Sequence, residues 1–115
     1  METIEEKLPE GNIYITEIEK LRFIMRDATG LDIMYAYENL VFSEHGLYVF
    51  ETDSKKLNEI HCYFNIDFEK SKQLLFLEKM ILSASLNGMV LLNKGTFEMT
   101  QNPDGQSVSL MFHKL

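Results

Sequence analysis

The sequence contains no tryptophan, a single cysteine, two prolines and six glycines among its 115 residues. One cysteine cannot form an internal disulfide, which excludes the small disulfide-stapled folds of secreted proteins. The low proline and glycine content leaves no stretch with the composition of a linker or a low-complexity segment. We therefore expect residues 1–115 to form a single domain, in which residues 1–12 are a flexible arm.

Long apolar runs are also missing, since no stretch of about 18 apolar residues is present that could cross a bilayer as a helix. The acidic N-terminal residues differ from the basic and then apolar start of a secretory signal. We therefore expect a cytoplasmic protein without a membrane partner. The lone Cys62 agrees with a reducing compartment.

Basic residues are scarce, with 11 Lys and Arg against 18 Asp and Glu, which gives a formal net charge of −7. Proteins that bind nucleic acids usually present a basic face to the phosphates, so we expect no nucleic-acid partner. An acidic surface favours a basic partner, although it also serves solubility.

Motifs for catalysis are absent as well. The sequence has no phosphate-binding loop, no dinucleotide-binding fingerprint and no nucleophile elbow. His61 and Cys62 are adjacent on a predicted strand and must point to opposite faces, and no histidine pair has the spacing of a zinc site. We therefore expect no metal, no cofactor and no catalytic residue, so that an enzymatic role has no positive support.

What the sequence does contain is a long amphipathic segment over residues 67–86, which Asn87 and Gly88 end. At about 100° per residue its apolar side chains form two stripes. One stripe holds Phe68, Leu75, Leu82 and Leu86, and the other holds Leu74, Leu77, Ile81 and Ala84. A helix on the surface of its own domain needs only one stripe. We expect one stripe to cover the sheet and the other to meet the first helix or a second copy of the chain.

Glu78 lies between the two stripes, on a line with Ser71 and Ser85. We expect its side chain to be partly buried, which raises the pKa of a carboxyl group. Two interpretations stay open: a carboxylate hydrogen-bonded at the edge of a helix contact, or a polar group that fixes the register of a self-association interface. The predicted partner surface consists of Leu74, Leu77, Glu78, Ile81 and Ala84.

A first helix is predicted over residues 16–29. Thr16 and Glu19 have the spacing of a capping box, and Gly30 supplies the left-handed residue that ends a helix. Its apolar residues lie on one side only, and Phe23 points away from them as an exposed aromatic that a contact surface could use.

The rest of the chain has the two-residue period of strands. We expect a three-stranded meander over residues 33–42, 47–52 and 59–65, with an irregularity at Glu38 and Asn39 and a turn at 43–46. The middle strand is apolar on both sides, so both of its faces should be covered. Residues 89–92 and 96–101 flank a bulge at Gly95, and the turn at 102–105 favours a hairpin with residues 107–113.

The predicted order is therefore helix, three strands, helix and two or three strands. This is an α+β fold, with two helices packed on a mainly antiparallel sheet of five to six strands.

Three segments carry a resemblance to a known family. They are residues 42–50 (FSEHGLYVF), residues 74–86, and residues 97–112 around the turn at 102–105. In this order they look like the first hairpin, the dimerising second helix and the last hairpin of the effector-binding chaperones of type III secretion systems. The resemblance implies a homodimer that holds an unfolded segment of a client protein on apolar surface without nucleotide.

Three hypotheses about function stay open. The first is a small binding or adaptor protein that forms a homodimer and holds a protein or peptide client in the manner of a chaperone. The second is a small-ligand-binding or enzymatic domain with a pocket between helix and sheet. The third is a monomer whose second stripe packs on the first helix and which exposes no apolar patch. The residues predicted for a sheet-face contact or a pocket are Tyr35, Tyr48, Phe50, His61 and Tyr63.

Overall fold

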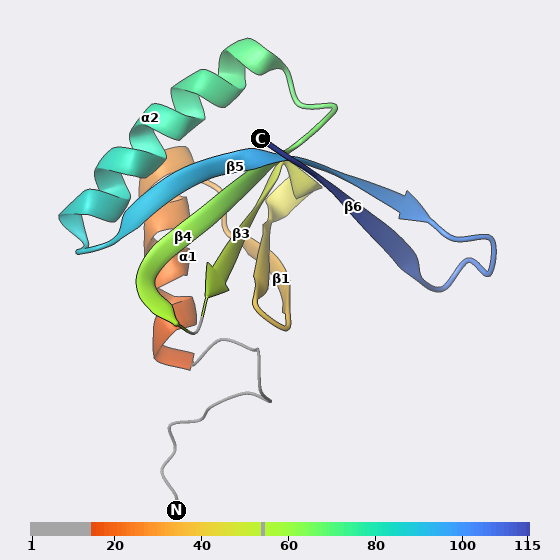
Figure 1. Cartoon of the computed structure of the whole chain (residues 1–115), viewed down its shortest axis with the longest axis horizontal. Helices are drawn as coiled ribbons and strands as arrows, with labels where there is room; N and C mark the ends of the chain where they lie inside the picture. The colour runs from red at the N-terminus through yellow and green to blue at the C-terminus, as the bar shows by residue number, and fades with distance from the viewer. Residues whose placement is uncertain (1–14, 54) are drawn as a thin grey trace, which may run out of the picture.

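A computed structural model describes residues 15–53 and 55–115 of the chain, so the predicted arm at 1–12 lies outside the described residues. The described part contains two helices, a short 3-10 turn and six strands (Figure 1). In chain order these are α1 (Ile15–Thr29), β1 (Ile33–Tyr37), β2 (Leu40–Ser43), η1 (Glu44–Gly46), β3 (Tyr48–Asp53), β4 (Lys56–Asn65), α2 (Lys70–Leu86), β5 (Val90–Gln101) and β6 (Val108–Lys114).

The six strands form one sheet in the order β1-β2-β3-β4-β5-β6. Every neighbouring pair is antiparallel except β4 and β5, which are parallel. The predicted fold class, two helices packed on a mainly antiparallel sheet, is confirmed. Thr16 falls inside α1, and its side chain lies outside the described residues, so the predicted capping box stays a prediction.

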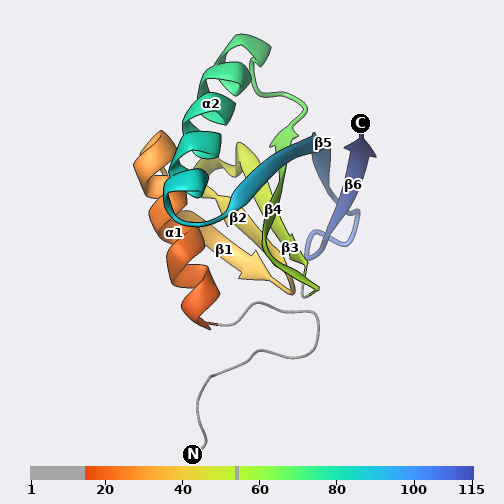
Figure 2. The same cartoon turned by 60° about the vertical axis from the view of Figure 1, so that its left-hand side comes forward.

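Both helices lie side by side on one face of the sheet (Figures 1 and 2). The reason is the parallel pair, because parallel neighbours can be joined only by a crossover that passes over one face. That crossover is α2, and α1 packs beside it. We call this side of the sheet the helix-covered face.

The main core fills the space between the helices and the sheet. Tyr48, on β3, sits at its centre, and its hydroxyl lies 2.6 Å from the hydroxyl of Thr29, which gives the buried phenol a partner. Burial raises the pKa of the Tyr48 hydroxyl. The other buried members of this core are Leu21, Ile24, Met25, Ala28, Val41, Phe50, Ile60, Cys62, Phe64, Met80, Ala84, Met89 and Leu91.

The opposite side, which we call the open face, has no helix over it in the described part of the chain (Figure 2). It is nevertheless partly buried, because its side chains cover one another. Tyr35 stacks on Phe42 with ring centroids 4.8 Å apart, and the rings of Phe42 and Phe97 are 6.1 Å apart. In a flat sheet β2 and β5 would lie about 14 Å apart. The sheet must therefore curl around this face.

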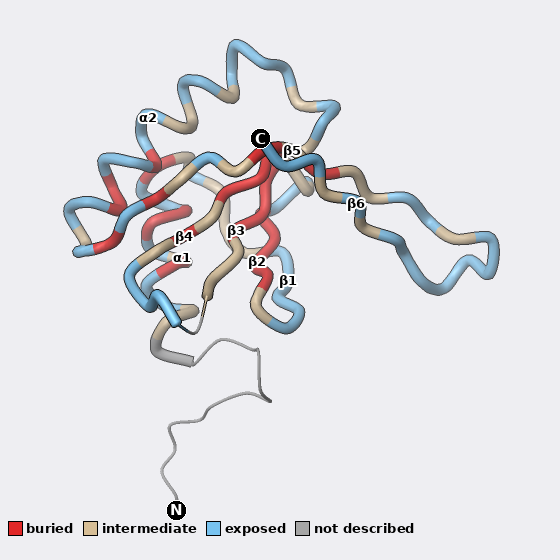
Figure 3. The backbone as a smooth tube through the Cα atoms, viewed as in Figure 1, coloured by how far each residue is buried: buried red, intermediate tan, exposed pale blue. Residues whose placement is uncertain are grey.

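The middle strand is buried from both sides, as the sequence predicts. Tyr48 and Phe50 point into the main core, while Val49 belongs to a second buried cluster on the open face. The buried members of that second cluster are Leu40, Phe42, Val49, Tyr63 and Phe97, and Met99, Leu110 and Phe112 pack against them (Figure 3 shows the buried strands).

The end of α2 is confirmed and its start is corrected. Gly88 has φ +76°, and the N–H groups of Gly88 and Met89 donate to the carbonyls of Ser85 and Ala84, which closes the helix. The predicted start at residue 67 is wrong, because the helix begins at Lys70 after Glu69. The Asn65 side chain accepts the N–H of residue 67 and its carbonyl accepts the N–H of residue 68, which holds this segment in a turn.

The strand predicted over residues 33–42 is in fact two strands. The chain reverses at Glu38 and Asn39, where Tyr37 pairs with Leu40 and Glu38 adopts φ +55°. Because no glycine marks this turn, the sequence predicts only an irregularity within one strand. The turn is held by Asn39, whose side-chain amide donates to the Thr52 carbonyl at 2.7 Å.

The last hairpin and the bulge are confirmed. At the turn, Gly105 has φ +71°, and Asn102 donates its N–H to the Ser107 carbonyl. At the bulge, the β4–β5 register shifts and Gly95 adopts φ +139°. A Cβ atom on Gly95 would lie far inside contact distance of the His113 backbone carbonyl. Glycine is therefore required where β6 pairs with the bulged part of β5.

We predict that Gly95→Ala lowers the free energy of unfolding by about 2–4 kcal/mol, because it adds both backbone strain and a steric clash. Gly105→Ala is the matched control, since Gly105 also has positive φ but has no atom within 4 Å of the new Cβ. It should cost about 1–2 kcal/mol from the left-handed conformation alone. Urea unfolding followed by circular dichroism measures both, and equal losses would contradict the assigned clash.

Candidate functional site: the outer face of α2 and the open face

The side of α2 that points away from the domain carries a row of large aliphatic side chains. The helix turns Met80, Ser83 and Ala84 inward. On the other side the exposed fractions are 65% for Leu74, 58% for Leu75, 45% for Ile81, 61% for Leu82 and 76% for Leu86. We call these five residues, together with Glu78, the outer face of α2.

The predicted partner surface is divided by the structure. Leu74, Glu78 and Ile81 are exposed on the outer face, as a partner surface requires. Leu77 is half-buried against the main core and Ala84 is fully buried, so these two assignments are corrected.

The cause of this division is the direction in which α2 faces the sheet. Its buried side is centred near Met80, with Phe76 packed beside it. Neither residue belongs to a predicted stripe. The buried arc of α2 is therefore rotated by about one side-chain position from the arc that the sequence predicts. In the other predicted stripe, Leu75, Leu82 and Leu86 point to solvent, whereas Phe68 precedes α2 and packs against the main core.

Glu78 is exposed rather than partly buried, which corrects the expectation for its side chain. It makes no ion pair or side-chain hydrogen bond with another described residue. Its neighbours at three and four residues in either direction are Leu74, Leu75, Ile81 and Leu82. An unpaired carboxylate therefore stands in the middle of an apolar surface.

The hypothesis of a monomer predicts that no apolar patch is exposed, and this part of the hypothesis is wrong. Helix α1 does pack against α2, but it does so at the inward side of α2 (Figure 2). All residues of the outer face of α2 remain exposed in the described part of the chain.

The residues predicted for a sheet-face contact or pocket do not converge. Tyr48 and Phe50 are fully buried on the helix-covered face, and Tyr35, His61 and Tyr63 lie on the open face. Main-core side chains fill the space between the helices and the sheet. The predicted pocket in that space is therefore corrected.

The open face instead carries a polar hollow of about 300 Å³. Its lining residues are Asn39, Glu51, Thr52, Asp53, His61, Tyr63 and Lys114. Nε2 of His61 lies 2.9 Å from the Glu59 carboxylate, and its Nδ1 lies 3.6 Å from that of Glu51. The Tyr63 hydroxyl donates to Glu51 at 3.4 Å.

This hollow is acidic, and hydrogen bonds and ion pairs hold its charged side chains in place. The hydrogen bond with His61 lowers the pKa of Glu59, and desolvation followed by the nearby Glu51 raises the pKa of Tyr63. Two carboxylates orient the imidazole, an arrangement that can accept a positively charged or hydrogen-bond-donating group. Among the described residues, no three His, Cys, Asp or Glu side chains are placed to hold a metal ion.

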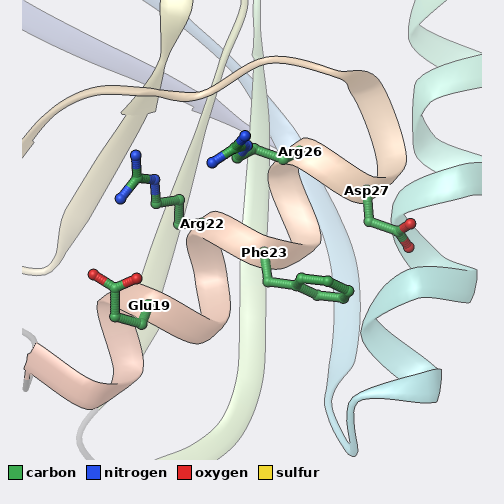
Figure 4. Close-up of a pocket in the computed structure, with 5 residues that line it drawn as sticks. All are labelled: Glu19, Arg22, Phe23, Arg26 and Asp27. Carbon is green, nitrogen blue, oxygen red and sulfur yellow. The ribbon is translucent and has the colours of Figure 1, made fainter.

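A larger hollow of about 510 Å³ lies on α1 (Figure 4). All five lining residues, Glu19, Arg22, Phe23, Arg26 and Asp27, come from the outward side of that one helix. It is thus a depression between neighbouring side chains rather than a cleft between elements. Phe23 is 55% exposed, which confirms that it points away from the apolar side of the helix.

Arg22 has a structural role at this surface. It donates from Nε and from a terminal nitrogen to the two carboxylate oxygens of Asp32, at 2.9 and 3.1 Å. This pairing raises the pKa of Arg22 and lowers that of Asp32. It ties the segment before β1 to the middle of α1.

A further exposed surface is the outer edge of β1, which is the first strand of the sheet. No described strand pairs with this edge, and β1 contains no charged residue. Met34, Tyr35 and Tyr37 are 46%, 40% and 60% exposed. The sequence predicts the strand but has no signal for its position at the edge.

No protein-family model, curated protein or solved structure matches this chain. None of the described helices has the length and apolar character needed to cross a membrane. The candidate site is therefore defined by geometry: an apolar helix face on one side of the molecule, and an aromatic sheet face with an unpaired edge on the other.

Proposed function

We propose that this protein is a non-enzymatic binding protein that forms a homodimer through the outer face of α2 and holds an extended segment of a protein client. The observation that carries the proposal is the row of five exposed aliphatic side chains on α2. Monomeric proteins rarely leave a contiguous apolar patch of this kind in water.

The exposed area is large enough for self-association. The five side chains together leave about as much apolar surface in water as three fully exposed leucines. Burying one such side chain yields about 1.5–3 kcal/mol. In a symmetric pair both copies contribute, so the gain is of the same order as the cost of association, about 4–15 kcal/mol. A homodimer at micromolar concentration is energetically accessible.

The client is proposed to lie along β1 and the open face. An extended segment that pairs with the free edge of β1 would form main-chain hydrogen bonds and place alternate side chains beside Tyr35 and Tyr37. The net charge of −7 and the acidic hollow at Glu51 favour a segment that carries basic as well as apolar residues.

The resemblance to type III secretion chaperones supports the same function. The order of helix, strands, helix and strands agrees with that family. The chain departs from the family pattern by having four strands before α2 instead of three. A cytoplasmic location also fits, because Cys62 is a free and buried thiol.

We predict that Leu82→Glu converts the homodimer to a monomer at about 20 µM, because it places a charge in the proposed contact and weakens association by about 100-fold. Leu57→Glu is the matched control, since both leucines are 61% exposed and Leu57 lies on β4, away from α2. Light scattering coupled to size exclusion measures the mass. A monomeric wild-type protein at this concentration would contradict the proposal.

We predict that a ten-residue peptide alternating valine and lysine binds at least about fivefold more tightly than a valine–glutamate peptide of equal length. Tyr37→Lys should weaken the first interaction about fivefold, because it adds a positive charge beside the β1 edge. Phe23→Lys is the control, since this aromatic is similarly exposed but lies on α1. Fluorescence anisotropy measures the affinities, and equal binding of both peptides would exclude this client chemistry.

A small-ligand-binding role is the second candidate, and one observation favours it: the hollow around His61, Glu51 and Tyr63. A thermal-shift screen of metabolites tests this role, with Glu51→Gln as the variant that should remove any stabilisation. If no compound raises the melting temperature of the wild-type protein, the small-ligand function is ruled out.

A further inference from the structure

The outer face of α2 has nearly the same pattern in both chain directions from Glu78. Leu75 and Ile81 lie three residues away on either side, and Leu74 and Leu82 lie four residues away. Ser71 and Ser85 lie seven residues away, which is two helical turns. All seven residues are exposed, so the pattern belongs to the accessible surface and not to the core.

A surface with this pattern is complementary to a second copy of itself. In an isologous contact, a residue that meets a second residue of the other copy is met in return by the same pair reversed, and only a residue at the two-fold axis meets its own symmetry mate. With the axis at Glu78 and the helices antiparallel, Leu75 lies level with Ile81 of the other copy along the helix axis, and Leu74 lies level with Leu82. The symmetry of the pattern ends eight residues from Glu78, where Lys70 lies opposite Leu86 of the other copy. The aliphatic part of the lysine side chain can cover this leucine.

We infer that two copies of this chain pair antiparallel through α2, with the two-fold axis passing between the two Glu78 side chains. The inference rests on the proposed homodimer and names its geometry. The small serines at both ends let the helix axes approach to about 8–10 Å, the usual distance for packed helices.

Glu78 sets the register of this pair. Sliding one helix by a turn would bury each Glu78 carboxylate against a leucine of the other copy, with no partner for its charge. In the symmetric register the two carboxyl groups meet each other and can share one proton. The alternative registers are therefore disfavoured by an unpaired charge, while the apolar contacts alone would allow several of them.

The shared site makes the association depend on pH. Two carboxylates held side by side repel each other, and a proton shared between them removes this repulsion. Since the homodimer then binds a proton that the separate chains do not, it tightens as pH falls from neutral. The charged groups of α2 nearest to Glu78, Lys72 and Lys79, lie on its flank, and α1 and β5 pack against the opposite side of the helix.

Cysteine cross-linking tests the geometry. Under mild oxidation Glu78→Cys should form a disulfide-linked dimer, because its symmetry mate is adjacent. Ser71→Cys and Ser85→Cys should each fail alone, but an equimolar mixture of the two should cross-link. The wild-type protein is the control, because its Cys62 is buried and cannot link two copies.

The outcomes separate this inference from the proposed function. A homodimer by mass in which residue 78 does not cross-link, or in which residue 71 links to itself, would overturn the antiparallel axis but leave self-association intact. A monomer by mass would overturn both.

The titration tests the role of Glu78 independently. We expect the dissociation constant of the wild-type homodimer to be about tenfold lower at about pH 5.5 than at about pH 7.5, because protonation of one carboxyl group removes the repulsion between the pair. Glu78→Gln should be about tenfold tighter than wild type at the higher pH and insensitive to pH. Asp27→Asn removes the same charge from α1 and should keep the wild-type profile. If both variants behave alike, net charge explains the effect and Glu78 is not at the axis.

Discussion

The parallel pairing of β4 with β5 is the constraint on which the rest of the molecule depends. Parallel neighbours need a long crossover, and here that crossover is α2. It must lie on one face of the sheet, where its inward side around Met80 and Ala84 closes the main core together with α1. Because one side of the helix is used in this way, its opposite side faces water, and that side carries the five aliphatic residues of the outer face of α2.

The two faces of the sheet reach burial by different means. On the helix-covered face, α1 and α2 exclude water from Tyr48 and Phe50. On the open face, the sheet curls until Phe42 approaches Phe97, and Tyr35 and Phe112 cover the gaps. The bulge at Gly95 lies in the strand that carries Phe97, and bulges add to the bending of a strand. Glycine is needed there because β6 pairs closely with the β5 backbone.

The proposed surfaces lie on opposite sides of the molecule, so a homodimer joined through α2 would leave β1 and the open face accessible to a client (Figure 2). In such an assembly two client surfaces would belong to one particle, and an extended segment that reaches both would gain from their high effective concentration. The acidic hollow at His61 and Glu51 would then act as a specificity element for basic side chains rather than as a reaction centre.

The sequence by itself determined the order of elements, the end of α2, the bulge at Gly95 and the last hairpin, because each has a local cause such as a helical period, a glycine at positive φ or a turn dipeptide. It could not reveal the turn at Glu38, which depends on a hydrogen bond from Asn39 to β3. Only the tertiary structure decided which arc of α2 is buried and that β4 and β5 run parallel. Both depend on contacts between residues far apart in the chain. Leu77 is half-buried and Ala84 is buried because the sheet lies on their side of the helix, while Leu74 and Ile81, further round the helix, remain exposed.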